Sequence, residues 1–324
     1  MGLTNFPNGI SSMGIPLMGS GIPATPGKVM FVDYGNGSDG VSEKALSASR
    51  AWKTLDKAVN AATTNKDDVI CLVGNSTHTL TEMLTVSKNR LHFVGLDGGM
   101  RYCGQNAKVS LGVTTAATDI GTILNTGVRN TFQNIKFINE NTVAEGIYCF
   151  VDGGEYTIIN GCEIYKSTDL DQTGAAELVM NGDSSLVINS VIGSNVNAIS
   201  GAIIRTNVLF TAGLAAAGKV ARDVKFENCT FWKKAGNVNN RYMYGANATD
   251  IERMLHVKDC LFFNTKLASA LPAQCVAFGA EQTDGFCLLD NCVSINNTKL
   301  STTTGVYIQG AVPTYATSGI SVAS

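Results

Sequence analysis

Acidic side chains are the residues of this chain whose type and spacing suit hydrolytic chemistry. Between residues 145 and 177 the acids are Glu145, Asp152, Glu155, Glu163, Asp169, Asp171 and Glu177. Glycoside hydrolysis needs two carboxyl groups about 5–10 Å apart, one as acid and one as base or nucleophile. Glu163, Asp169 and Asp171 are the catalytic candidates of this stretch. Asp169 and Asp171 lie in a predicted loop, where solvated acids are common.

Other residue types suggest little further chemistry. The histidines are His78, His92 and His256, of which His92 and His256 fall in different predicted coils, far apart in the sequence. The cysteines form no CxxC pair of the kind found in zinc and redox sites. Residues 233–250 combine basic and aromatic side chains that could bind glycan or nucleic acid. An ordinary insertion or a protein contact is the favoured interpretation of that segment. We therefore predict no metal site and no cofactor.

A short repeated pattern must position all of these side chains. Each copy is a strand of alternating apolar residues, a polar or small residue, a cysteine or its substitute, and a second strand. The copies are NTFQNIKF at 130–137, TIINGCEI at 157–164, SLVINSVI at 185–192, VKFENCTF at 224–231, LHVKDCLF at 255–262 and CLLDNCVS at 287–294. Their central residues are Ile135, Cys162, Ser190, Cys229, Cys260 and Cys292.

The residue before the central position suits a bend in the chain. It is Gly161, Asn228, Asp259 or Asn291 in four of the copies. A strand, bend and strand recurring roughly every 30 residues is typical of a solenoid of stacked coils. Equivalent residues of stacked coils lie above one another, so the central cysteines are predicted to form a buried column. Cysteine behaves there as a small hydrophobe and not as a metal ligand.

These coils resemble the right-handed parallel β-helix of the pectin-lyase-like superfamily. The N-terminal part agrees, with strands predicted at 28–33, 68–74 and 91–96, a turn-rich loop at 35–40 and an amphipathic helix near 52–62. Trp52, Leu55, Ala58 and Val59 share one face of that helix, which would cap the exposed end of the stack. The predicted fold is all-β, with the β-helix spanning residues 28–299.

The resemblance implies a fold without selecting a function, because this fold carries lyases, hydrolases and structural proteins. Enzymes of the superfamily place carboxylates on neighbouring coils. Glu163 is predicted to point outward and to stack between Lys136 and Val191, so no acidic ladder forms there. A non-catalytic role is therefore favoured. If the chain is an enzyme, the resemblance implies a polysaccharide lyase or a glycoside hydrolase.

Composition sets the outer limits on function. The chain has 324 residues, 44% hydrophobic and only 15% charged, with a net charge of −2. Disordered chains combine low hydrophobicity with high net charge, which this chain does not. Nucleic-acid binding normally requires a basic surface. The sequence has no apolar run long enough for a transmembrane helix and no signal-peptide pattern. We expect neither nucleic acid nor membrane as a partner.

Both ends of the chain lack charged side chains. Residues 1–27 combine glycines and prolines with large apolar residues, which favours an extended arm lying on another protein; a floppy tail is the alternative. The predicted attachment residues are Leu3, Phe6, Ile10, Ile15, Leu17, Met18 and Ile22. Residues 300–324 are expected to cap the stack or to pair with a neighbouring molecule.

Several apolar residues fall at outward positions of the predicted coils. They are Ile158, Leu186, Ile188, Val191, Leu261, Leu288 and Val293. Large exposed apolar patches usually mark an interface, so these residues are predicted to join subunits of a homotrimer with cyclic symmetry. The alternative is that loops of the same chain cover this face.

The opening GLTNFPNGISS, followed by a Gly/Pro segment and the strand–loop–helix start, resembles virion-associated β-helix proteins of tailed bacteriophages. The resemblance implies a structural decoration, cement or head-fibre protein on the capsid exterior. Its partner would be the major capsid protein or another virion protein. The alternatives are a tailspike or fibre that binds or cleaves host glycan, and a free carbohydrate-active enzyme. Unpaired cysteines suit synthesis in the bacterial cytoplasm.

Overall fold

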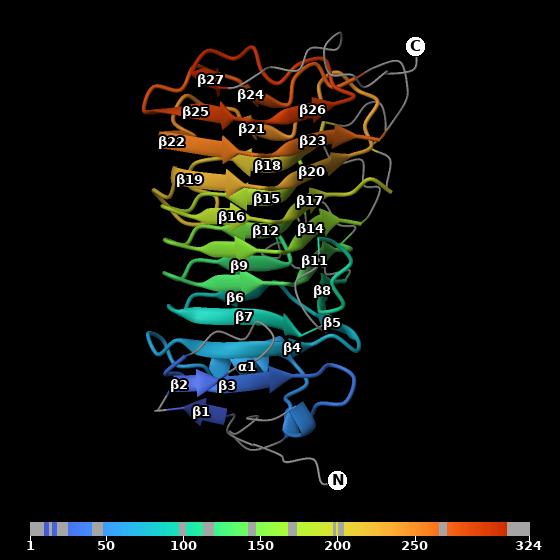
Figure 1. The fold of residues 1–324 in the computed structure, drawn as a ribbon, viewed down its shortest axis with the longest axis vertical. Helices are drawn as coiled ribbons and strands as arrows, with labels where there is room; N and C mark the ends of the chain where they lie inside the picture. The colour runs from blue at the N-terminus through green and yellow to red at the C-terminus, as the bar shows by residue number, and fades with distance from the viewer. Residues whose placement is uncertain are drawn as a thin grey trace.

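The computed structural model describes residues 10–12, 15–17, 25–40, 48–96, 102–112, 120–141, 147–167, 174–196, 199, 204–265 and 271–309. Within these residues, three long parallel sheets run side by side along the axis of the molecule (Figure 1). Successive coils each add a strand to the sheets, as a solenoid does. The predicted all-β, right-handed parallel β-helix is confirmed.

The longest sheet has ten strands. Its members are β3 (Val29–Val32), β4 (Asp68–Val73), β7 (Leu91–Leu96), β10 (Thr131–Gln133), β13 (Ile158–Asn160), β16 (Leu186–Ile188), β19 (Ala221–Glu227), β22 (Ile251–Lys258), β25 (Gly285–Asp290) and β27 (Val306–Gln309). This ten-stranded sheet contains the first strand of each repeated sequence copy.

An eight-stranded sheet follows directly after the bend of each coil. Its members are β5 (Thr77–Leu80), β8 (Lys108–Leu111), β11 (Lys136–Asn139), β14 (Glu163–Lys166), β17 (Val191–Gly193), β20 (Thr230–Lys233), β23 (Leu261–Asn264) and β26 (Val293–Ile295). In Figure 1 these strands lie to the right of the ten-stranded sheet.

The repeated pattern did not predict the third sheet. This seven-stranded sheet lies behind the other two in Figure 1. It consists of β6 (Leu84–Val86), β9 (Ile123–Asn125), β12 (Tyr148–Asp152), β15 (Ala176–Met180), β18 (Thr206–Phe210), β21 (Met243–Gly245) and β24 (Val276–Phe278).

The bend and the buried column match the sequence prediction. Each bend residue has a left-handed backbone, with φ between 49° and 61°: Asn134, Gly161, Asn189, Asn228, Asp259 and Asn291. Glycine and asparagine adopt this conformation with less strain than other residues. The six central residues that follow are at most 4% exposed: Ile135, Cys162, Ser190, Cys229, Cys260 and Cys292. The bend therefore turns the chain so that both strands face one apolar core.

The capping helix is shorter than predicted. Helix α1 spans Leu55–Ala61, and Thr54 caps its N-terminus by accepting a hydrogen bond from the Lys57 amide. Trp52 is buried but forms a bridge with Val32 of β3, so it precedes the helix. At the other end, the Lys88 ammonium donates to the carbonyls of Val59, Asn60 and Ala62. These contacts hold α1 at the N-terminal end of the stack (Figure 1).

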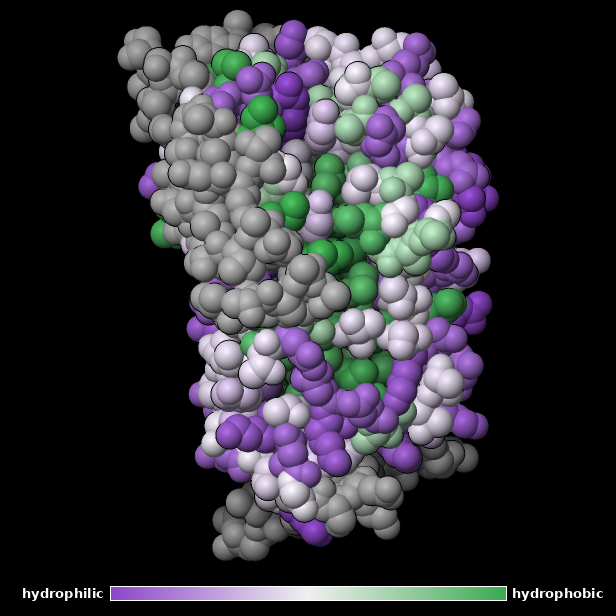
Figure 2. Space-filling model, turned by 180° about the vertical axis from the view of Figure 1, so that it is seen from behind, coloured by the Kyte–Doolittle hydropathy of each residue, from purple (hydrophilic) through white to green (hydrophobic). Residues whose placement is uncertain are grey.

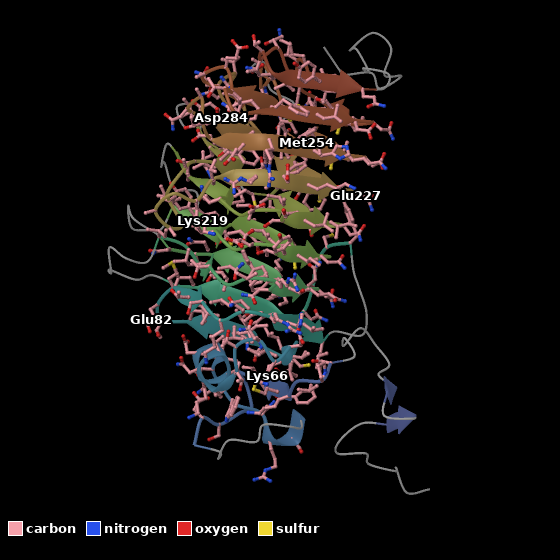
Figure 3. The ribbon with its side chains drawn as sticks, turned by 90° about the vertical axis from the view of Figure 1, so that its left-hand side faces the viewer. Lys66, Glu82, Lys219, Glu227, Met254 and Asp284 are labelled. Carbon is pink, nitrogen blue, oxygen red and sulfur yellow. The ribbon has the colours of Figure 1, made fainter. Side chains whose placement is uncertain are left out.

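Both ends of the chain contain strands that the sequence pattern did not predict. Strand β27 pairs with β25, so the ten-stranded sheet continues beyond the predicted end at residue 299. Near the N-terminus, β1 (Ile10–Ser12) and β2 (Ile15–Leu17) form a separate antiparallel hairpin within the predicted extended arm. Figure 3 shows this hairpin to one side of the stack. No helix in the described ranges has the length and apolar character to cross a membrane.

Candidate functional site

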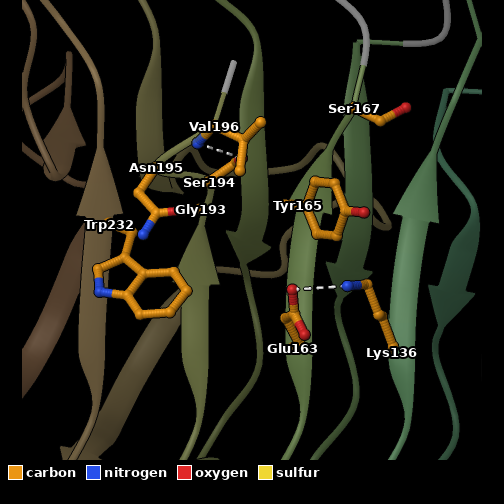
Figure 4. A pocket seen from close by; sticks show the side chains of 9 residues that line it. All are labelled: Lys136, Glu163, Tyr165, Ser167, Gly193, Ser194, Asn195, Val196 and Trp232. Atoms are coloured by element: carbon orange, nitrogen blue, oxygen red, sulfur yellow. Dashed lines mark hydrogen bonds and ion pairs between the residues drawn. The ribbon is translucent and has the colours of Figure 1, made fainter. Parts of the chain in front are cut away.

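A pocket of about 330 Å³ opens on the outer face of the eight-stranded sheet (Figure 4). Side chains in β-strands alternate between the two faces of a sheet. On β14, Ile164 and Lys166 are buried inward, and Glu163 and Tyr165 therefore face outward. The lining residues are Lys136, Glu163, Tyr165, Ser167, Gly193, Ser194, Asn195, Val196 and Trp232.

An ion pair forms one wall of the pocket. The Lys136 ammonium lies 2.9 Å from the Glu163 carboxylate, on the neighbouring rung. The second carboxylate oxygen accepts a hydrogen bond of 2.9 Å from the Gly104 amide. Burial disfavours protonation of Lys136, but hydrogen bonding and charge from Glu163 and Tyr165 outweigh it and raise the pKa of the ammonium. The pair is therefore charged and internally neutralised.

A segment at 102–105 covers the sheet next to the pocket. The Tyr102 hydroxyl donates to Thr230 at 2.8 Å, and its ring packs edge-on against Trp232 with 5.9 Å between centroids. The Gln105 amide donates to the Gly161 carbonyl at 2.7 Å. The segment thus fixes Trp232 and restricts solvent access to Glu163, which is only 7% exposed. The sequence predicted an outward Glu163 correctly but gave no sign of this cover.

The described members of the acidic stretch all have partners. Glu163 pairs with Lys136, Glu155 with Lys219 at 2.7 Å, and Glu177 with Arg205 at 3.0 Å. Asp152 is fully buried and accepts hydrogen bonds from Asn125, Thr157 and Ser185. Burial raises its pKa, although these hydrogen bonds act in the opposite direction. Glu145, Asp169 and Asp171 lie outside the described residues.

Within the part of the chain that the structure describes, the pocket does not show the paired carboxylates of a glycosidase site. Glu163 is the only carboxylate among the described residues that line the pocket, whereas glycoside hydrolysis uses two. The described residues also contain no group of three or more His, Cys, Asp or Glu placed to hold a metal ion. The pocket can accept hydrogen bonds, donate them and stack rings, which are the elements of a binding site.

The predicted interface residues do not form one face. Ile158, Leu186, Ile188 and Leu288 lie on the ten-stranded sheet, and Val191, Leu261 and Val293 lie on the eight-stranded sheet. On the ten-stranded sheet, Lys225 and His256 separate Leu186 from Leu288 along the stack. The seven predicted interface residues are therefore divided between two sheets, and polar residues interrupt those on the ten-stranded sheet.

The position of Val191 contradicts its predicted role as a subunit-interface residue. Val191 lies on the rung between Glu163 and Thr230, both of which the segment at 102–105 contacts. Its side chain is fully buried within the chain, so it is not available to a second subunit. Here the alternative applies, in which the chain covers its own outer face.

The continuous outward apolar column lies on the seven-stranded sheet instead. Its register runs through Leu124, Val151, Val179, Leu209 and Tyr244. Val151 and Val179 are buried, and Leu214 and Ala215 pack against their cluster. Figure 2 shows the apolar surface along this side of the molecule. A segment of the same chain thus covers the middle of this column.

The remaining predicted residues fall into two groups. Among the attachment residues, Ile10, Ile15 and Leu17 belong to the β1–β2 hairpin, where Ile10 is opposite Leu17; Leu3, Phe6, Met18 and Ile22 lie outside the described residues. Within 233–250, Lys233 and Tyr242 are fully buried. Those two side chains therefore cannot form a basic, aromatic binding surface.

Comparisons with known proteins agree on the architecture. No family model matches the chain, and no curated protein matches it. Among solved structures, a pectate lyase is similar with a TM-score of 0.60 and 13% identity, over 87% of this chain and 68% of that one. A pectin methylesterase from Aspergillus niger is similar with a TM-score of 0.56 and 13% identity, over 90% of this chain and 87% of that one.

A rhamnogalacturonan lyase gives a TM-score of 0.56 at 13% identity, over 84% of this chain and 69% of that one. Structural similarity at such low sequence identity establishes a shared fold but does not establish a shared activity. The chain therefore has the parallel β-helix architecture of pectin-lyase-like proteins.

Proposed function

We propose that this chain is a structural protein on the exterior of a tailed bacteriophage virion, attached through residues 1–27. The observation that carries the proposal is the β1–β2 hairpin. Its strands pair with each other and with no strand of the three long sheets in the described part of the chain. The arm is uncharged and rich in apolar residues, which suits burial against another protein.

The body of the β-helix supports a scaffolding role. Acids on its surface pair with bases on adjacent rungs: Asp183 with Arg222 at 3.2 Å, and Asp223 with Arg253 at 2.8 Å. Arg222 also pairs with Glu252. Carboxylates held by stacked cations stabilise neighbouring coils modestly and are poorly placed to move protons. This chemistry suits a rigid support better than a polysaccharide lyase or hydrolase.

Attachment would place the protein on the capsid, against the major capsid protein or another virion protein. A homotrimer would present three arms at once, and multiple arms raise the apparent affinity without new contacts. The second candidate is a tailspike or fibre that binds host glycan, and the pocket beside Trp232 is the feature that favours it.

The test uses particles assembled without this chain, to which purified protein is added before co-sedimentation. We expect the full chain to co-sediment and a chain lacking residues 1–27 to remain in solution with an unchanged thermal midpoint. The matched control is Val238→Asp, which adds a charge at an exposed position of the body and should not alter attachment. Equal co-sedimentation of the shortened chain would overturn the proposal.

A further inference from the structure

One outward column of the eight-stranded sheet contains aromatic residues separated by a glycine. Ile138 is paired with Tyr165, and Gly193 with Trp232, which is in turn paired with Phe263. Ile164 is paired with Ile192, so Tyr165 and Gly193 occupy adjacent rungs. The glycine therefore leaves a notch between the Tyr165 and Trp232 side chains (Figure 4).

The backbone requires glycine at this position. Gly193 has φ of 100°, and a Cβ there would overlap the Trp232 carbonyl and the Asn207 amide. The notch is thus a fixed feature of the coil. Strands lie about 4.8 Å apart, so two rungs separate the ring-bearing strands by about 9.6 Å. Carbon atoms in contact are about 3.5–4 Å apart, which leaves room for one ring between the two aromatic side chains.

The polar groups of the notch favour an uncharged ligand that carries hydroxyls. Glu163 and Lys136 neutralise each other at 2.9 Å, so the pocket presents no net charge to a ligand. A carboxylate offers about four acceptor sites and an ammonium three donors, so each group can make further hydrogen bonds. Ser194 and Asn195 add neutral polar groups at the rim.

We propose that the notch between Tyr165 and Trp232 binds one neutral pyranose unit of a saccharide. The C–H faces of the sugar lie against the aromatic rings, and its hydroxyls bond to the Glu163–Lys136 pair. A nucleobase would also stack, but nucleic-acid binding adds cations for the phosphates, and Glu163 already neutralises Lys136. The inference rests on the pocket alone and does not depend on attachment through residues 1–27.

Intrinsic fluorescence provides a direct measurement. The chain has two tryptophans; Trp52 is buried beneath the cap and Trp232 lines the pocket. The probes are neutral hexasaccharides of glucose, galactose and mannose, each titrated to about 20 mM, in the range expected for a weak single-unit site. We expect at least one to change the Trp232 emission with a saturable curve.

Variants assign the binding to the notch. Tyr165→Ala should weaken binding at least tenfold, measured by the same fluorescence titration. Phe263→Ala, one rung beyond Trp232 in the same column, should leave the affinity unchanged and controls for general loss of an aromatic ring. Thermal midpoints of both variants establish that they are folded.

Three results would overturn the proposal. These are no saturable change with any neutral probe, equal weakening by Phe263→Ala, or tighter binding of an oligogalacturonate or a hexathymidine oligonucleotide than of every neutral probe. None of them bears on co-sedimentation with particles, so failure of the saccharide site and failure of the attachment proposal are distinguishable.

Discussion

Charged residues lie inside this β-helix as well as on its surface. Lys233 and Arg205 are 2% and 4% exposed. The Lys233 ammonium donates to the Arg205 carbonyl at 2.8 Å, and the Arg205 guanidinium pairs with Glu177. Burial lowers the pKa of Lys233 to about 7, with Glu177 acting against this shift and Arg205 adding to it. The interior therefore disfavours the charged form of this lysine.

The shift makes stability depend on pH. An unfolded lysine has a pKa of about 10.4, so between about pH 7 and 10 the unfolded state binds more protons and stability rises with pH. Lys233→Met removes this dependence but leaves the Arg205 carbonyl without its donor, at a cost of about 1–3 kcal/mol. We expect the thermal midpoint of the variant to be closest to that of wild type near pH 6.5. The difference between the two midpoints should increase toward pH 9.5, with the variant less stable.

Lys234→Met is the matched control, because Lys234 is adjacent and half-buried, with its ammonium bonded to the Val196 carbonyl at 3.2 Å. Its midpoints should follow those of the wild type across the pH range. Parallel curves for Lys233→Met and wild type would show that no buried cation at position 233 contributes to stability.

Residue type predicted the interior well where side chains were apolar and poorly where they were charged. The cysteine column followed from regular spacing alone. Lysine is seldom buried, so the burial of Lys233 had no signal in the sequence, and its partner Arg205 comes from another coil. The environment of Glu163 was equally hidden, since the Gly104 amide lies 59 residues earlier in the chain. Such contacts depend on which coils lie side by side.

The bend between the ten-stranded and eight-stranded sheets controls each coil. Asn228 has φ of 51° there, and its amide donates to the Asn189 side chain at 2.8 Å. Asn189 donates in turn to Asn160 at 3.3 Å. The bend residues thus adopt the left-handed backbone that the turn requires, and their side chains also link successive coils.

Substitutions at Asn228 separate these two contributions. Asn228→Gly keeps the left-handed backbone and loses the side-chain hydrogen bond, for a loss of about 0.5–1.5 kcal/mol. Asn228→Val adds a further steric cost of about 1–2 kcal/mol. We expect thermal midpoints in the order wild type, glycine, valine. Lys225→Val, in the extended part of β19, should stay close to wild type, and a valine variant as stable as the glycine variant would refute the steric argument.

The seven-stranded sheet shows why only two strands of each coil could be predicted from the sequence. The ten-stranded and eight-stranded sheets are joined by one bend residue, so their strands keep a fixed spacing and repeat visibly. Strands such as β18 and β21 follow connections of unequal length, which removes the spacing from the sequence. Several of these strands are also buried on both faces, as in β12, so they lack the alternation that identifies a half-buried strand.

The outer faces of the whole molecule differ in how they are covered. Segments of the chain itself lie over Val191 on the eight-stranded sheet and over Val151 and Val179 on the seven-stranded sheet. On the ten-stranded sheet, Ile158 is 38% exposed and pairs with the half-buried Leu186. Leu261 and Val293 form a second predicted pair, on the eight-stranded sheet, in which Val293 is 39% exposed. Ile158 and Leu186 are therefore one of two predicted pairs at which a subunit contact would act.

Sedimentation equilibrium tests this interface. If Ile158 and Leu186 pack between subunits, the full chain should have a mass near three times 34.1 kDa, and Ile158→Arg should give the monomer. Burying an unpaired charge at an interface costs several kcal/mol, which exceeds the apolar gain of about 1.5–3 kcal/mol from one isoleucine. Val238→Arg adds the same charge at an exposed position and should remain trimeric. A wild-type mass of 34.1 kDa would exclude a stable free trimer, and a trimeric Ile158→Arg would place the contact on another face.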